Sequence, residues 1–118
     1  MNKVFITGRI VGQPVLRMEQ GDIPHLIFGL AVRHRTKAGD VHKEVYPISA
    51  WNQVAQWGAE NLQKGQVVGV QGYLAQRSIN VSNVRTIVTE IAVDEFLPML
   101  MVTGDQKSVA ETDEETAE

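Results

Sequence analysis

One stretch with helical periodicity stands inside a chain that otherwise reads as β-strands, and it limits the folds available. The stretch runs from Asn52 to Gln63. Four of its apolar or small residues are spaced to share one face of a helix: Val54, Ala55, Gly58 and Leu62. Asn52 is expected to cap the start of the helix, and Lys64-Gly65 to stop it. The fold must therefore place a single helix among strands.

Five segments have the composition and the period-two alternation of strands, at residues 4–11, 23–33, 42–51, 66–77 and 84–93. Gly12-Gln-Pro14 is expected to end the first of them. Ala38-Gly39-Asp40 predicts a turn before the third, and the polar residues 80–83 predict the connection between the last two.

Three strands, one helix and two further strands is the order of the OB-fold, a five-stranded Greek-key barrel. We therefore expect an all-β fold with one helix between strands 3 and 4. An SH3-like barrel does not need a helix at this place, and a β-sandwich needs about seven strands.

The charge of the chain is unevenly distributed. The 118 residues carry 11 Lys and Arg against 14 Asp and Glu, a net charge of −3. Residues 105–118 contain six of the acids and one of the bases, so residues 1–104 carry ten bases and eight acids, a net +2. We expect a mildly basic domain over 1–104 and an acidic, disordered tail over 105–118. The net charge alone therefore does not exclude a nucleic-acid partner.

Several functional classes lack their sequence signatures. No nucleophile elbow, phosphate-binding loop or metalloprotease motif is present, so we expect no enzymatic activity. The chain has no Cys, and its three histidines, at positions 25, 34 and 42, are well separated, so no metal or other cofactor is expected. No apolar run is long enough for a membrane span, and we expect a cytoplasmic protein without a membrane partner.

Two large aromatic residues lie on the polar sides of their strands. Trp51 alternates with Ser49, and Tyr73 alternates with Arg77. Exposed rings on a sheet can stack on the bases of single-stranded nucleic acid whatever the base. Two other roles stay open: Trp51 could close the end of the barrel, and Tyr73 could pack in a subunit interface.

Basic residues accompany these rings, and a solvated basic surface without a ligand is the alternative to a phosphate-binding role. Four surround the turn between the second and third strands: Arg33, Arg35, Lys37 and Lys43. Arg77 and Arg85 flank the turn between the last two. In OB-folds these loops border the binding groove. We therefore predict contacts with single-stranded DNA by these six cations together with Trp51 and Tyr73.

Three stretches resemble the bacterial single-stranded DNA-binding protein (SSB) family: Met1–Arg9, Trp51–Gly65 with its Leu-Gln-Lys-Gly end, and Gly69–Arg77. The resemblance covers about residues 1–96. It implies sequence-independent binding of single-stranded DNA in replication, recombination or repair, and a homo-oligomer, usually a tetramer. By position, Trp51 matches a stacking aromatic of the family. Thr36, Val45 and Ile79 stand where the family usually has other aromatics.

Gly21-Asp-Ile-Pro-His25 and Gly72–Ser78 resemble the related PriB primosomal proteins, which are dimers. An alternative function is therefore a PriB-like primosome component that bridges single-stranded DNA and a helicase. Another is an OB-fold module that binds proteins and no nucleic acid. In the SSB family an acidic tail docks partner proteins, so replication proteins are candidate partners of the tail.

Overall fold

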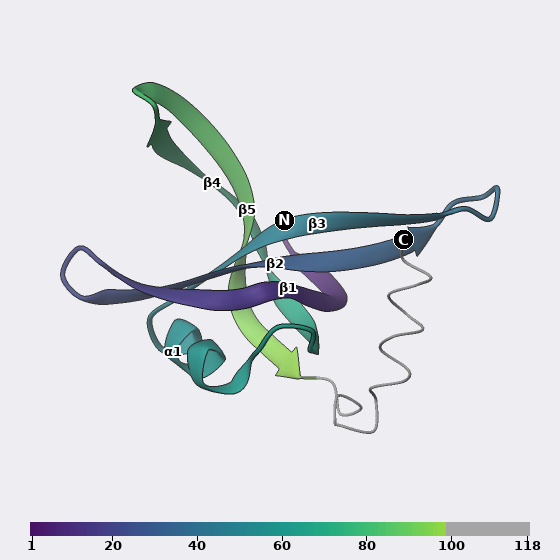
Figure 1. The fold of residues 1–118 in the computed structure, drawn as a ribbon, viewed down its shortest axis with the longest axis horizontal. Coiled ribbons are helices and arrows are strands. Elements are labelled where there is room, and N and C mark those ends of the chain that lie inside the picture. The colour runs from purple at the N-terminus through teal and green to yellow at the C-terminus, as the bar shows by residue number, and fades with distance from the viewer. Residues whose placement is uncertain (99–118) are drawn as a thin grey trace.

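The computed structural model describes residues 1–98, so the predicted tail at 105–118 lies outside the described residues. Five strands close into a barrel in the order β1-β2-β3-β5-β4, and one helix follows β3 (Figure 1). The elements are β1 (Val4–Glu19), β2 (Ile23–Arg35), β3 (Val41–Trp51), α1 (Asn52–Asn61), β4 (Val67–Val81) and β5 (Val84–Pro98). This architecture confirms the predicted OB-fold with its helix between strands 3 and 4.

β1 is longer than predicted, and the expectation that Gly12-Gln-Pro14 ends it is wrong. Residues 4–9 pair with β4, and residues 9–19 pair with β2, with a register shift between Val11 and Val15. Gly12, at φ +74°, takes up this irregularity because glycine tolerates the left-handed region. The bulge thus bends β1 so that its two halves pair with different strands, β4 and β2.

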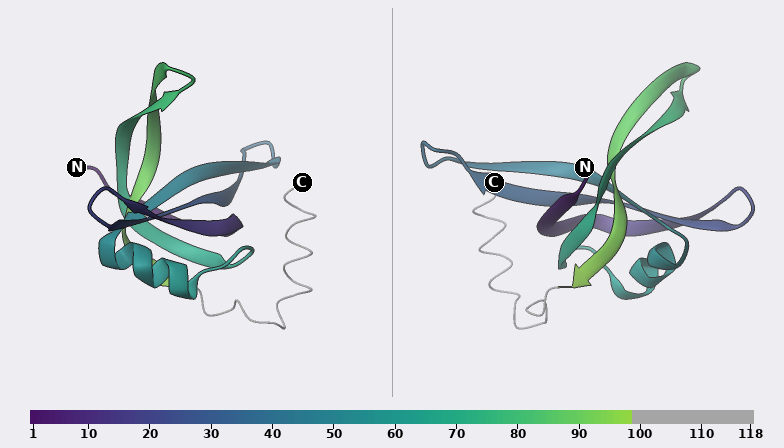
Figure 2. Two further views of the ribbon diagram at one scale, coloured as in Figure 1. Left: turned by 60° about the vertical axis from the view of Figure 1, so that its left-hand side comes forward. Right: turned by 180° about the vertical axis from the view of Figure 1, so that it is seen from behind.

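Two long hairpins leave the barrel in different directions (Figures 1 and 2). β2 and β3 pair from His25↔Trp51 out to Arg35↔Val41, and Gly39 lies in their predicted turn. β4 and β5 pair as far as Val81↔Val84, with both Ser82 and Asn83 at positive φ. Positive φ at both central residues is typical of a tight two-residue hairpin turn.

The core lies inside the barrel, and α1 covers the end away from the β4–β5 hairpin (Figures 1 and 2). The core-facing sides of the strands supply Ile10, Leu26, Phe28, Leu30, Ile48, Ala50, Val68, Val70, Ile91 and Phe96. The predicted helix face is confirmed, since Ala55 and Leu62 are buried and Val54 packs against the core. A Cβ on Gly58 would lie 2.5 Å from the Leu26 Cδ2 atom, so this glycine lets the helix approach closely.

The predicted helix cap is wrong. Asn52 is itself the first helical residue, at φ +58°, and extended Trp51 is the N-cap, without a side-chain cap. The helix ends at Asn61, where the Leu62 N–H bonds to the Gly58 carbonyl, two residues earlier than predicted. No helix within residues 1–98 is long and apolar enough to cross a membrane.

Candidate nucleic-acid interface

The outer side of the barrel forms one continuous face across four strands. Cross-strand partners point to the same side of a sheet. Ser49 pairs with Ile27 in β2 and with Ala92 in β5, and Ala92 pairs with Tyr73 in β4. These four residues therefore form one row, in which Ser49 and Tyr73 lie two strand spacings, or about 10 Å, apart. Trp51 is two residues from Ser49, so it and Tyr73 lie on the same face.

Trp51 lies flat against a histidine of the neighbouring strand. Its register partner is His25, and the two ring centroids are 3.6 Å apart with planes only 5° from parallel. Trp51 stays partly exposed, whereas His25 is fully buried. One face of the indole is therefore covered by imidazole.

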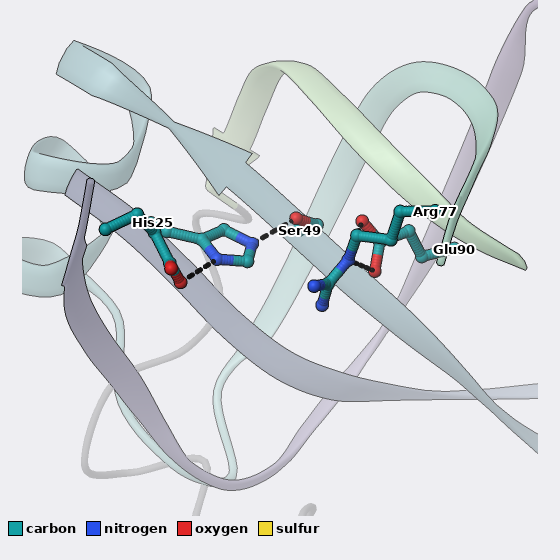
Figure 3. A network of polar contacts seen from close by, with 5 residues as sticks. His25, Ser49, Arg77 and Glu90 are labelled. Atoms are coloured by element: carbon teal, nitrogen blue, oxygen red, sulfur yellow. Dashed lines mark hydrogen bonds and ion pairs between the residues drawn. The ribbon is translucent and has the colours of Figure 1, made fainter. Parts of the chain in front are cut away.

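His25 is held at both ring nitrogens. Nδ1 lies 3.0 Å from Glu19 Oε2, and Nε2 lies 2.6 Å from Ser49 Oγ (Figure 3). The hydrogen bond with His25 lowers the pKa of Glu19 below its ordinary value. Desolvation opposes this shift, and the charges of His25, Arg17 and Arg77 lower the pKa further.

Sequence reasoning missed Glu19, His25 and Ser49 as parts of the site. It considered His25 only as a possible metal ligand. The available signal was that His25 lies on the polar side of its strand, yet the pairing that brings it onto Trp51 is visible only in the barrel.

Tyr73 and Arg77 both lie on the outer face of the β4–β5 hairpin. Tyr73 is 41% exposed, so its ring is accessible. Arg77 Nε donates to both carboxylate oxygens of Glu90, each at 3.1 Å, and its terminal nitrogens point away from that carboxylate (Figure 3). Glu90 is itself 5% exposed. The ion pair therefore holds a partly exposed cation on the outer face of β4.

The predicted basic cluster lies along the β2–β3 hairpin. Arg33 and Lys43 are register partners, and Arg35 follows on the same side. Lys37 lies in the turn, and all four cations are exposed. Since the Arg33–Lys43 pair is eight residues from the His25–Trp51 pair along β2, the two are about 27 Å apart on the same face.

Arg85 is not brought together with the other predicted residues. It pairs with Asn80, and its Nε donates to Ser78 Oγ at 2.7 Å. Ser78 and Asn80 point to the side of β4 opposite to that of Tyr73 and Arg77, because successive side chains of a strand alternate. Arg85 therefore lies on the opposite face of the β4–β5 hairpin.

The arrangement offers rings and cations. The Glu19–His25–Ser49 chain has the hydrogen-bond order of a catalytic triad, but His25 and Ser49 are both fully buried, so the Ser49 hydroxyl is closed to a substrate. Among residues 1–98, no three His, Asp or Glu side chains are grouped so that they could hold a metal ion. His34 and His42 stack on each other near the β2–β3 turn, with ring centroids 5.7 Å apart. What this face can do chemically is stack planar groups and neutralise anions along a strip.

Comparison with known proteins adds an independent finding. A model of the single-strand binding protein family matches residues 1–99. A single-stranded DNA-binding protein of Caldanaerobacter subterraneus is 34% identical over 98 residues, covering 80% of this chain and 65% of that protein. Single-stranded DNA-binding protein 3 of Clostridium acetobutylicum is 35% identical, covering 80% of this chain and 68% of the relative. The chain thus spans about two thirds of the length of these relatives.

Proposed function

The chain belongs to the single-strand binding protein family, and on that premise we propose that it binds single-stranded DNA without reading its sequence. In this proposal the bases stack on Trp51 and Tyr73. The phosphates are neutralised by Arg33, Arg35, Lys37, Lys43, Arg77 and Arg85. Members of the family bind DNA and are not enzymes, in agreement with the predicted lack of catalysis.

The observation that carries the proposal is the shared outer face of Trp51, Tyr73 and the Arg33–Lys43 pair. Stacking contributes about 1–3 kcal/mol per base and tolerates any base, and cations along the groove neutralise the phosphates of the DNA backbone. A strip about 27 Å long from ring to cations fits an extended strand better than a compact ligand. The opposite orientation of Arg85 makes it the weakest member of the predicted set.

The test is a titration of the protein with oligo-dT while tryptophan fluorescence is followed. A Trp57→Phe background isolates the signal of Trp51, because Trp57 packs on Phe96 in the helix–barrel contact. We expect quenching of Trp51 and an affinity that falls with salt. Trp51→Ala should weaken binding about 5- to 150-fold while the protein stays folded. An unchanged signal together with no mobility shift of the oligonucleotide would contradict the proposal.

Exposed apolar side chains away from this strip support the proposal that the protein is a homo-oligomer. Phe5 on β1 is 66% exposed, and Leu97 on β5 is 43% exposed. Large exposed apolar patches typically mark interfaces. Sedimentation equilibrium should give a tetramer if the protein acts as a general DNA-coating protein, and a dimer if it acts as a PriB-like primosome component. A monomer at micromolar concentration would contradict self-association.

The wider role that we propose is in replication, recombination or repair in the cytoplasm, with replication proteins as partners of residues 105–118. The rival is a protein-interaction module without a nucleic-acid ligand, which the loss of family aromatics at Thr36, Val45 and Ile79 favours. A pull-down that recovers a partner protein while oligo-dT fails to bind would favour that rival.

Deletion of residues 105–118 tests the tail. If the shortened protein no longer captures a partner protein but binds oligo-dT with unchanged affinity, the tail is the docking site for that partner.

A further inference from the structure

Beneath Trp51, the predicted stacking residue, lies His25, a buried polar side chain that the proposed DNA contacts do not explain. His25 is 0% exposed although it alternates with the outer-face residues of β2. A buried polar ring is tolerated only when its nitrogens are hydrogen-bonded. Both nitrogens are, through Glu19 and Ser49. Within residues 1–98, no buried side-chain nitrogen or oxygen lacks a partner.

The two hydrogen bonds fix the plane of the imidazole. Glu19 is ionised near neutral pH, since its ordinary pKa of 4.5 already lies well below 7 and the bond with His25 lowers it further. A carboxylate can only accept, so Nδ1 carries the proton and donates to it. Ser49 approaches Nε2 from β3, on the other side of the ring. A planar ring held at two opposed nitrogens cannot rotate without breaking one of the bonds.

The fixed imidazole in turn determines the plane of the indole. The rings are nearly parallel at a centroid distance of 3.6 Å, so rotation of Trp51 would remove the stacking contact. Ser49 is also two residues from Trp51 on the same strand and the same face. The chain of contacts therefore runs from Glu19 at the end of β1, through β2, to both Ser49 and Trp51 on β3.

We propose that Glu19, His25 and Ser49 form a positioning unit that holds the Trp51 ring with only its outward face open to a base. This inference rests on the proposed DNA-binding function and deepens it. A ring that is ordered before DNA arrives loses less conformational entropy on binding. The unit also limits Trp51 to stacking against one base at a time, because the imidazole occupies the other side.

The first experiment needs no DNA. In the Trp57→Phe protein, the fluorescence anisotropy of Trp51 and its quenching by acrylamide report the order and accessibility of the ring. We expect Ser49→Ala and Glu19→Gln each to lower the anisotropy and to increase acrylamide quenching. Glu60→Gln is the matched control, because it removes an equal charge from the exposed surface of α1. Equal values for Glu19→Gln, Ser49→Ala and the control would overturn the inference.

The second experiment is a double-mutant cycle on the affinity for oligo-dT. When Trp51 is present, Ser49→Ala should weaken oligo-dT binding about 3-fold or more. This loss should be smaller than the loss of about 5- to 150-fold expected when the whole stacking ring is removed. In the Trp51→Ala protein, Ser49→Ala should cause no further loss. The same loss in both backgrounds would show that Ser49 acts on the fold in general, and would overturn the inference.

His25→Leu should reproduce both effects more strongly, and the Ser49 and Glu19 variants decide the question if that variant does not fold. The two levels of the proposal fail in different ways. A parent protein that does not bind oligo-dT overturns the proposed function, and with it the role of the unit in DNA binding. Normal oligo-dT binding with an unaltered Trp51 signal in every variant overturns the positioning unit alone.

Discussion

Arg77 Nε on β4 donates to both carboxylate oxygens of Glu90, a β5 residue that is only 5% exposed. A buried carboxylate requires a partner, because its charge is costly to remove from water. Arg77 therefore has a structural partner in Glu90 in addition to the DNA contact that we propose for it.

Arg77→Ala should lower the free energy of unfolding by about 1–3 kcal/mol, because it leaves the Glu90 carboxylate without its partner. The value is below that of a fully buried pair, since the Arg77 side chain is 38% exposed and water screens it. Urea unfolding measures the change. Arg85→Ala, which removes an exposed cation, should change stability by less than about 0.5 kcal/mol. Equal losses in both variants would contradict a special role of the Arg77–Glu90 pair.

Gly58→Ala should destabilise the protein by about 1–3 kcal/mol, although alanine normally favours a helix. The added Cβ would lie 2.5 Å from Leu26 Cδ2 and 3.1 Å from Phe96 Cε2, both in the packed core. Gln56→Ala, on the exposed side of α1, is the control and should be neutral or slightly stabilising. Thermal unfolding of the two variants compares them, and a stabilised Gly58→Ala protein would refute the close approach of α1 to the barrel.

Lys43→Ala should reduce the slope of log affinity against log salt by about 0.7, the value for one lost phosphate contact with a single strand. The expected cause is the position of Lys43 opposite Arg33 on the outer face. Lys64→Ala removes the same charge at the end of the helix and should leave the slope unchanged. Titrations with oligo-dT at several salt concentrations provide the comparison. Identical slopes for the two variants would remove Lys43 from the interface.

The stability of the fold should depend on pH through Glu19 in the acid range. Its pKa in the folded protein lies below the ordinary 4.5, mainly because of the hydrogen bond with His25. The carboxylate therefore stabilises the fold above pH 4.5, and this contribution is lost as the pH falls through the lower, folded-state pKa. Urea unfolding between pH 7 and pH 3 should show a smaller decrease for Glu19→Gln than for Glu60→Gln. The opposite order would contradict the Glu19–His25 contact.

Tyr46 should ionise at higher pH than an ordinary tyrosine. Its hydroxyl donates to Glu44 Oε1 at 2.6 Å, and this bond to a carboxylate raises the pKa of the phenol above 10.0. The contact stabilises the fold below pH 10.0, and its contribution is lost as the pH rises through the folded-state pKa. Phenolate absorbance in a Tyr73→Phe protein isolates Tyr46. Glu44→Gln should move this titration to lower pH, and no movement would disprove the bond.

Local pattern was sufficient for much of the fold. The alternation of residues 23–33 predicts a half-buried strand, and Leu26, Phe28 and Leu30 on one side of it are buried. Helical spacing predicts one shared face for Ala55 and Leu62, and both are buried. The errors fell at element ends. Gly12 was read as the end of β1 because the sequence does not show that a bulged strand can continue against a second partner. Asn52 was read as a cap because its residue type favours one, whereas Trp51 occupies that position.

The sequence by itself determined the order of the elements and which residues of one strand share a side, since both follow from local periodicity. Only the tertiary structure decided which of these side chains meet. The His25–Trp51 stack, the Arg77–Glu90 pair and the orientation of Arg85 all depend on the register between strands. Register is a non-local property, because packing across the whole barrel selects one alignment among several that the local sequence permits.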